Sequence, residues 1–271
     1  MEGDSLQVRE LSPDAFWSAA PKERLRLFGA ARTVARLNEA EVHYLPAVPR
    51  PPKLICVAAN YADHIREGGN ETALASVRPQ LFLKPQTTLS AHREVVLLPP
   101  TIQSFDWEAE LAVVIGQPLW RPSAAETMAG VIGYAACNDL SERALKVDAT
   151  PDERKNTWFF DWLAGKWING GLPLGPWLVT SDEIGDPQAL HIELKHNGKV
   201  MQDAPTAAML SPVEKIVWTA AQIMRLEPGD VIATGTPAGV GSASGLAIRP
   251  GDVIDVSISK IGTLTTRFAA E

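Results

Sequence analysis

The sequence predicts an α+β protein rich in strands, with a small helical segment ahead of a larger domain. Short apolar runs containing β-branched residues follow one another from Lys53 onward, which is typical of buried strands. Apolar residues recur at helical spacing within residues 12–41. In the larger domain, one segment carries clear helix-start residues, whereas several runs resemble strands. Most of this domain is therefore expected to be strand.

The N-terminal segment is expected to be helical over residues 12–41. A proline-rich passage follows at residues 45–52, where missing backbone donors disfavour a helix. We therefore expect a domain boundary here, with a helical segment at residues 1–50 and the main domain at residues 51–271. The apolar residues that suggest the helix are Leu25, Leu27, Phe28, Ala31, Val34, Ala35 and Leu37.

The main domain is expected to consist largely of strands. Asn197-Gly198 favours a hairpin turn. Ser211 as N-cap, Pro212 at the first helical position and Glu214 in a capping box predict the start of a helix. The expected strands are residues 54–58, 81–84, 94–98, 111–116, 131–137, 177–180 and 190–196.

Composition places the chain among ordinary soluble globular proteins, with 45% hydrophobic and 21% charged residues. The formal net charge of −7 argues against nucleic acid or an anionic membrane as the main partner. No apolar run approaches the roughly 18 residues of a membrane span, and the acidic N-terminus does not resemble a signal peptide. Cys56 and Cys137 are expected to be buried free thiols, and a cytoplasmic location is predicted.

The most informative feature is an acidic stretch that runs into a buried strand. Alternate side chains of a strand share one face, so Glu108 and Glu110 are expected to lie side by side, with Asp106 beyond them. A bound divalent cation would relieve their repulsion, and carboxylate oxygens favour a hard ion such as Mg²⁺. The alternative is a strand end at which these acids are solvated.

A second candidate site lies at residues 60–67, directly after the first strand of the main domain. If this segment is helical, His64 and Glu67 lie three residues apart on one face. A carboxylate beside an imidazole fixes its tautomer and raises its basicity, which suits a general base. The alternative is a routine ion pair on a surface helix.

Three other features gain meaning only in combination. Asp139 follows an apolar strand, where an acid either caps a helix or supplies a third metal ligand. Lys166 is either a solvated lysine or an active-site cation. The glycine-rich loop at residues 234–241 permits close backbone approach to a ligand, but it contains neither a dinucleotide fingerprint nor a Gly-Lys-Ser/Thr phosphate loop.

In this order, the motifs closely resemble those of the fumarylacetoacetate hydrolase family over about residues 53–268. The resemblance implies a mixed β-sandwich or β-roll of the fumarylacetoacetase C-terminal type with flanking helices, and a homodimer. The motifs are Asn60-Tyr61-x-x-His64-x-x-Glu67, Phe82-x-Lys84-Pro85, Glu108-x-Glu110, Asn138-Asp139 with Ser141-x-Arg143, Gly165-Lys166 with Pro173-Leu174-Gly175-Pro176, Asn197-Gly198, and the loop from Thr234 to Gly241.

The resemblance also implies a mechanism. Glu108, Glu110 and Asp139 would hold Mg²⁺ or Mn²⁺, with Ca²⁺ as an alternative in crystals, and the ion would stabilise the enolate of a 2-oxo acid as a Lewis acid. The His64–Glu67 dyad, on a mobile lid, would deprotonate a water that attacks the distal carbonyl of a β-diketo acid. Lys166 would neutralise the developing negative charge, and pyruvate would leave as the enolate when the C–C bond breaks.

Substrate contacts are implied for Arg143, Lys146 and Thr236. Lys146 stands where the family often has glutamine, so it adds a positive charge that alters the substrate or holds an extra carboxylate. Asn169 replaces a common aspartate. The segment at residues 147–163 is longer and more aromatic than the usual spacer, and we interpret it as a specificity loop over the site or a dimer contact.

The expected function is therefore Mg²⁺-dependent hydrolysis of a C–C bond in an acylpyruvate- or fumarylacetoacetate-like substrate. The nearest alternative is isomerisation or decarboxylation of a 2-oxo dienoate at the same metal, as in the degradation of aromatic compounds. Lyases and sugar-acid dehydratases also occur in the family. Retention of both His64 and Glu67 favours hydrolysis, because an enolising site needs the dyad less. A non-catalytic binding protein remains an alternative, which the full set of site residues disfavours.

Overall fold

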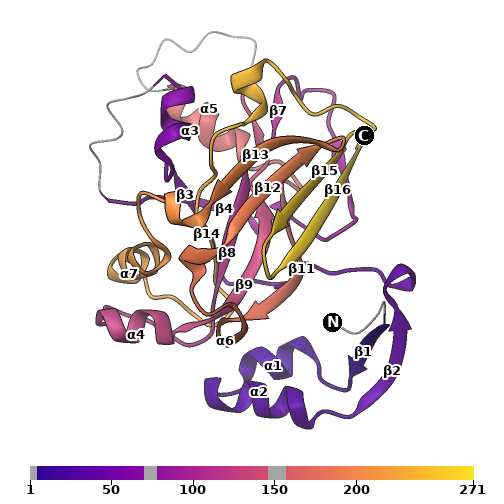
Figure 1. The fold of residues 1–271 in the computed structure, drawn as a ribbon, viewed down its shortest axis with the longest axis vertical. Helices are drawn as coiled ribbons and strands as arrows, with labels where there is room; N and C mark the ends of the chain where they lie inside the picture. Colours follow the sequence, from indigo (N-terminus) through magenta and orange to yellow (C-terminus); the bar gives the residue numbers. More distant parts are fainter. Residues whose placement is uncertain (1–4, 70–77, 146–156) are drawn as a thin grey trace. The chain divides into compact units, whose positions relative to one another are not determined.

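The computed structural model describes residues 5–69, 78–145 and 157–271 of the chain (Figure 1). The chain divides into two compact units, Met1–Tyr44 and Leu45–Glu271. No helix within the described ranges is long and apolar enough to span a membrane. The assignment of residues 1–50 and 51–271 as a helical segment and a catalytic domain stays a prediction.

The N-terminal unit combines two short helices with a two-stranded antiparallel sheet. Each helix begins at a proline, and the Ser12 side chain caps the first one by accepting from the backbone N–H of Ala15. The elements are β1 (Ser5–Arg9), α1 (Pro13–Ser18), α2 (Pro21–Ala30), β2 (Thr33–Asn38) and a 3₁₀ helix at Glu39–Glu41.

The predicted helix over residues 12–41 is correct for α1 and α2 but wrong for β2. Val34 and Leu37 fit helical spacing, yet both lie in a strand that pairs with β1. The partner strand precedes the segment and supplies the backbone hydrogen bonds of β2. Spacing within one segment does not reveal such a partner, so the pattern was ambiguous between helix and strand.

The larger unit is built on a seven-stranded mixed sheet with the order β4-β3-β14-β8-β9-β11-β5. Strand β8 lies in the middle of the sheet, and all seven of its residues are buried. Strands β8 and β9 run antiparallel, so the start of β8 lies beside the end of β9. The bounds are β3 (Leu54–Ala58), β4 (Gln80–Lys84), β5 (Leu89–Ser90), β8 (Ala109–Ile115), β9 (Val131–Asn138), β11 (Leu172–Thr180) and β14 (Val231–Ala233).

A five-stranded sheet with the order β13-β12-β15-β16-β6 packs on the first sheet, and buried residues of both form one apolar cluster (Figure 1). Asn197 and Gly198 form the predicted hairpin turn with positive φ angles of 50° and 80°. The prediction of a strand-rich α+β fold is confirmed. The remaining strands are β6 (Val95–Leu98), β12 (His191–His196), β13 (Lys199–Pro205), β15 (Val253–Ile258), β16 (Gly262–Ala270) and the pair β7 (Phe105–Asp106) and β10 (Ser141–Glu142).

The helix predicted to begin at Ser211 begins one residue later, and its predicted side-chain caps are absent. The N-cap is Pro212, and no cap side chain bonds to the first turn. Instead, Gln188 Oε1 accepts from Val213 N at 2.8 Å, which satisfies a free donor of the first turn from outside the helix. The helices of this unit are α3 (Ala62–Glu67), α4 (Ala124–Ala129), α5 (Thr157–Gly165), α6 (Ser181–Ile184) and α7 (Val213–Ile223).

Gly133 allows β9 to approach β11 closely. A Cβ at this position would lie 2.2 Å from the carbonyl oxygen of Val179, a backbone atom that has little room to shift. Gly133→Ala is therefore expected to lower the free energy of unfolding by about 1–3 kcal/mol, the usual cost of overpacking. Denaturant titration measures the loss. Gly29→Ala is the control, since a Cβ at Gly29 meets nothing within 4 Å; equal losses in both variants would contradict the packing argument.

Candidate active site

Three carboxylates meet where the start of β8 lies beside the end of β9. Glu108 directly precedes β8, Glu110 is the second residue of β8, and Asp139 directly follows β9. The backbone N–H of Asp139 donates to the carbonyl of Glu108 at 2.9 Å, which holds the two ends together. One carboxylate oxygen from each residue lies within 4.8 Å of the other two, and all three residues are buried. These oxygen donors suit a hard divalent ion such as Mg²⁺ or Mn²⁺.

Asp106, which the alternation placed beyond the two glutamates, serves a different purpose. Its carboxylate accepts from the backbone N–H groups of Gly241 and Ser242 at 2.6 and 3.1 Å. It also accepts from Arg143 Nε at 3.0 Å. Asp106 thus orients Arg143 and holds the end of the glycine-rich loop, and it does not join the three clustered carboxylates.

Three cations surround these carboxylates. Lys166 Nζ lies 2.8 Å from Glu108 Oε2 and 2.9 Å from Asp139 Oδ2, and it is itself buried. Arg143 Nη2 lies 2.6 Å from Glu108 Oε1. Lys84 is fully buried and donates to Asp139 Oδ1 and to two backbone carbonyls. The sequence marked Lys84 only as part of a motif; its burial at the end of β4 was the missing information.

The carboxylates differ in their electrostatic balance. Burial opposes ionisation of Glu108, but the charges of Lys166 and Arg143 outweigh it and hold the pKa of Glu108 well below its ordinary value. Glu110 has no cationic partner in the described part of the chain; burial and the charges of Asp139 and Glu108 raise its pKa well above the ordinary value. The one described hydrogen bond to its carboxylate comes from Gly235 N at 2.7 Å. Glu110 is therefore the carboxyl group whose ionised form a bound cation would stabilise most.

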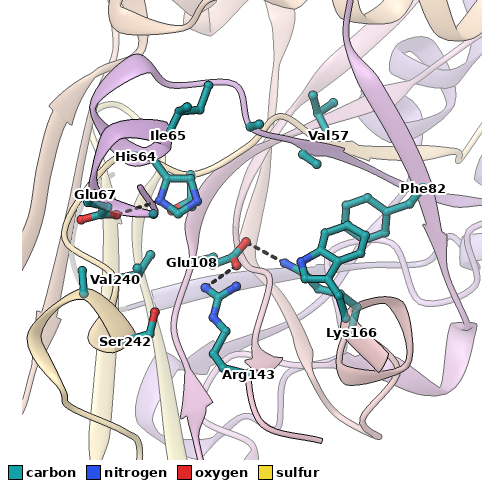
Figure 2. A pocket seen from close by; sticks show the side chains of 16 residues that line it. Val57, His64, Ile65, Glu67, Phe82, Glu108, Arg143, Lys166, Val240 and Ser242 are labelled. Carbon is teal, nitrogen blue, oxygen red and sulfur yellow. Dashed lines mark hydrogen bonds and ion pairs between the residues drawn. The ribbon is translucent and has the colours of Figure 1, made fainter. Parts of the chain in front are cut away.

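The predicted dyad is formed at α3. His64 Nδ1 lies 2.7 Å from Glu67 Oε1, and the other oxygen of Glu67 accepts from Gly239 N at 2.8 Å. An ionised carboxylate only accepts hydrogen bonds, so Nδ1 carries the proton and Nε2 is left basic. Figure 2 shows the dyad and Lys166 on opposite sides of Glu108.

These side chains line one cavity of about 530 Å³. Phe82 and Trp162 form part of its wall, in edge-to-face contact with ring centroids 5.1 Å apart. Ala59, directly before Asn60, has a φ of 57° in the left-handed region that favours glycine. The lining residues used below are His64, Glu67, Glu108, Arg143, Lys166 and Thr236.

The residues predicted to contact the substrate or to shape its site lie in different surroundings. Arg143 faces the cavity but is already paired with Asp106 and Glu108. Lys146 lies outside the described residues. Asn169 does not line this cavity and faces a separate one. Of the aromatic segment, residues 147–156 lie outside the described ranges; Trp162 of α5 lines the cavity, and its role in specificity stays a prediction.

The chain belongs to a known enzyme family. Residues 53–269 match the fumarylacetoacetate (FAA) hydrolase C-terminal family, which confirms the resemblance drawn from the motifs. Oxaloacetate tautomerase FAHD2A of Bos taurus is 36% identical over 233 residues, covering 85% of this chain and 71% of that protein. Oxaloacetate tautomerase YisK of Bacillus subtilis (strain 168) is 34% identical over 273 residues, covering 98% and 84%.

Among solved structures, maleylpyruvate hydrolase from Sphingobium sp. SYK-6, in complex with manganese(II) and pyruvate, aligns with a TM-score of 0.77 and 26% identity. The alignment covers 100% of this chain and 94% of that one. Together with the buried acidic triad, these relatives support a metal-dependent enzyme of this family.

If the triad holds the metal, Glu108→Gln and Asp139→Asn should each lose metal-dependent stabilisation. A bound ion raises stability by about RT ln(1 + [L]/Kd), so the melting temperature with Mn²⁺ should exceed that with chelator in the wild type but not in these two variants. Asp203→Asn, an exposed acid paired with His191, is the control and should keep the full shift. A full shift in both triad variants would disprove the ligand assignment.

Proposed function

We propose that this protein is a divalent-metal-dependent hydrolase that cleaves a C–C bond of a β-diketo acid, such as an acylpyruvate or a fumarylacetoacetate-like compound. The observation that carries the proposal is the position of the His64–Glu67 dyad, which faces the same cavity as Glu108 and Lys166. A histidine with a free Nε2 beside a cation site is the arrangement that activates water.

Glu108, Glu110 and Asp139 would hold Mg²⁺ or Mn²⁺. The ion would supply Lewis-acid stabilisation of negative charge on the oxygens of the 2-oxo acid. Lys166 would add a second positive charge on the same side of the cavity. Its own pKa is raised, since Asp139 and Glu108 outweigh the opposing effect of burial, so it stays protonated and acts as a cation, not as a base.

In the proposed reaction, a water gives a proton to His64 Nε2 and its oxygen attacks the distal carbonyl carbon of the substrate. The bond between that carbon and the methylene carbon then breaks, and the electron pair passes to the pyruvate fragment as its enolate. His64 returns the proton to the methylene carbon. The products are pyruvate and the carboxylic acid of the acyl group. Residues 51–271 would form the catalytic domain, since all these residues lie within it.

Tautomerisation of oxaloacetate is a second candidate, because several relatives at 34–36% identity, including the two named above, carry that name. This reaction needs only the transfer of a proton between a carbon and an oxygen of the substrate, and oxaloacetate is also a 2-oxo acid. His64 would then move a proton and no water would be consumed.

A product assay separates the two reactions. The protein is incubated with Mn²⁺ and, in parallel, with chelator, on acylpyruvates and on oxaloacetate. Metal-dependent release of pyruvate and a free acid supports the hydrolase. An accelerated enol–keto exchange of oxaloacetate with no release of acid from any acylpyruvate would replace it by the tautomerase.

His64→Ala is expected to lower kcat of hydrolysis by about 10²–10⁴-fold, the usual contribution of a general base. Mn²⁺ binding should be unchanged, since His64 is not in the carboxylate cluster. Stopped assays of product and melting curves with Mn²⁺ measure the two effects. His191→Ala is the control because that histidine pairs with exposed Asp203 away from the cavity. Near wild-type turnover in His64→Ala would contradict the proposed base.

A further inference from the structure

Gln202 connects the metal-binding strand to the loop that contains Thr236. It lies in β13 of the five-stranded sheet, and none of its side chain is exposed. Its Oε1 accepts from the backbone N–H of Ala109 at 2.9 Å, between the two glutamates of the triad. Its Nε2 donates to Thr236 Oγ1 at 2.8 Å and to the carbonyl of Pro237 at 2.7 Å. One buried amide thus bridges both halves of the site.

The orientation of this amide is determined by backbone groups. The N–H of Ala109 requires an acceptor, which must be the amide oxygen, and the carbonyl of Pro237 requires a donor, which must be the amide nitrogen. The amide nitrogen therefore also faces Thr236, whose hydroxyl oxygen has to accept. A hydroxyl has a single hydrogen, and no described contact uses that of Thr236. Because Thr236 lines the cavity, this hydrogen is left for a bound molecule.

The backbone around Thr236 has little freedom to rearrange this contact. Gly239 has a φ of 102°, and a Cβ there would lie 1.9 Å from the carbonyl oxygen of Met201, the neighbour of Gln202. Trp107 Nε1 also donates to the carbonyl of Gly239 at 3.0 Å. Strand β13 and the loop are therefore in direct backbone contact, and the Thr236 hydroxyl is held at a set position relative to Glu108 and Glu110.

We propose that Gln202 is a positioning residue that makes Thr236 a hydrogen-bond donor to an acceptor oxygen of the bound acid. The proposal rests on the proposed function only in that Thr236 touches the substrate. It adds a preference: at Thr236 the site offers a donor, which suits a carboxylate or carbonyl oxygen. A ligand that presents an N–H or O–H group there would leave this hydrogen unused and would meet only the second lone pair of the hydroxyl, because Gln202 donates to the first.

The test measures binding of oxalate, which presents acceptor oxygens only, to the Mn²⁺-loaded protein by calorimetry. Thr236→Val and Gln202→Met should each weaken oxalate binding by about tenfold or more, as expected for a lost hydrogen bond to a charged ligand. The double variant should bind no more weakly than Thr236→Val, because Gln202 acts through Thr236. Independent, multiplying losses would overturn the proposal, as would wild-type affinity in Gln202→Met.

Gln202→Glu gives a readout that a merely structural role would not move. A carboxylate keeps the acceptor for Ala109 N but removes the donors to Thr236 Oγ1 and to the carbonyl of Pro237, so the Thr236 hydroxyl turns to donate to residue 202. Oxalate binding should then fall as far as in Thr236→Val. This loss is expected whether or not the melting temperature of the metal-free protein changes. Should Gln202→Met fail to fold, this variant decides the question alone, and wild-type affinity in it would overturn the proposal.

Gln188→Met is the matched control. That amide also bridges two backbone groups, Thr206 O and Val213 N, but it does so away from the cavity. Its loss should leave oxalate binding unchanged; a loss equal to that of Gln202→Met would point to general destabilisation and overturn the proposal. If the wild-type protein with Mn²⁺ does not bind oxalate at all, the proposed function fails. If the wild type binds oxalate and the Gln202 variants bind it equally well, only the proposed role of Gln202 fails.

Discussion

The constraint on which this structure depends is the burial of four carboxylates at one point. Asp106, Glu108, Glu110 and Asp139 are all buried, and the buried or half-buried cations that pair with them are Lys84, Lys166 and Arg143. Four carboxylates against three cations leave Glu110 without a cationic partner in the described part of the chain, and burial beside Asp139 and Glu108 raises its pKa well above the ordinary value. Isolated buried charge is costly, so the site favours the neutral form of Glu110, and a bound cation would favour the ionised form.

The surrounding fold brings these charges together from distant parts of the chain. Strands β8 and β9 supply the carboxylates, β4 supplies Lys84, and the turn after α5 supplies Lys166. A hydrogen bond between the backbones of Asp139 and Glu108, and another from Glu108 N to Asn138 Oδ1, hold the two strand ends together. The glycine-rich loop is held by Asp106 and Gln202, so the substrate side and the metal side of the cavity share the same supports.

Local patterns in the sequence were sufficient for part of this site. Alternation along one strand places Glu108 beside Glu110, and a spacing of three on a helix places His64 beside Glu67, so both pairs are predictable from a few residues. The same alternation misplaced Asp106, because β7 ends and turns before Glu108. Asp139 became a ligand only through the family resemblance. Nothing local indicated the contacts of Lys84 or Gln202, since their partners lie 55 and 93 residues away in the chain.

The apolar wall of the cavity comes from elements that carry none of the three clustered carboxylates. Val57 lies in β3, Phe82 in β4 and Trp162 in α5. The ring centroids of Phe82 and Trp162 lie 5.4 and 5.8 Å from Lys166 Nζ, within cation–π range, so replacing either ring would also change the surroundings of a buried cation. Because the wall and the acidic cluster come from different elements, the shape of the cavity can change while the three carboxylates stay in place, and relatives of this chain are named both as tautomerases and as a hydrolase.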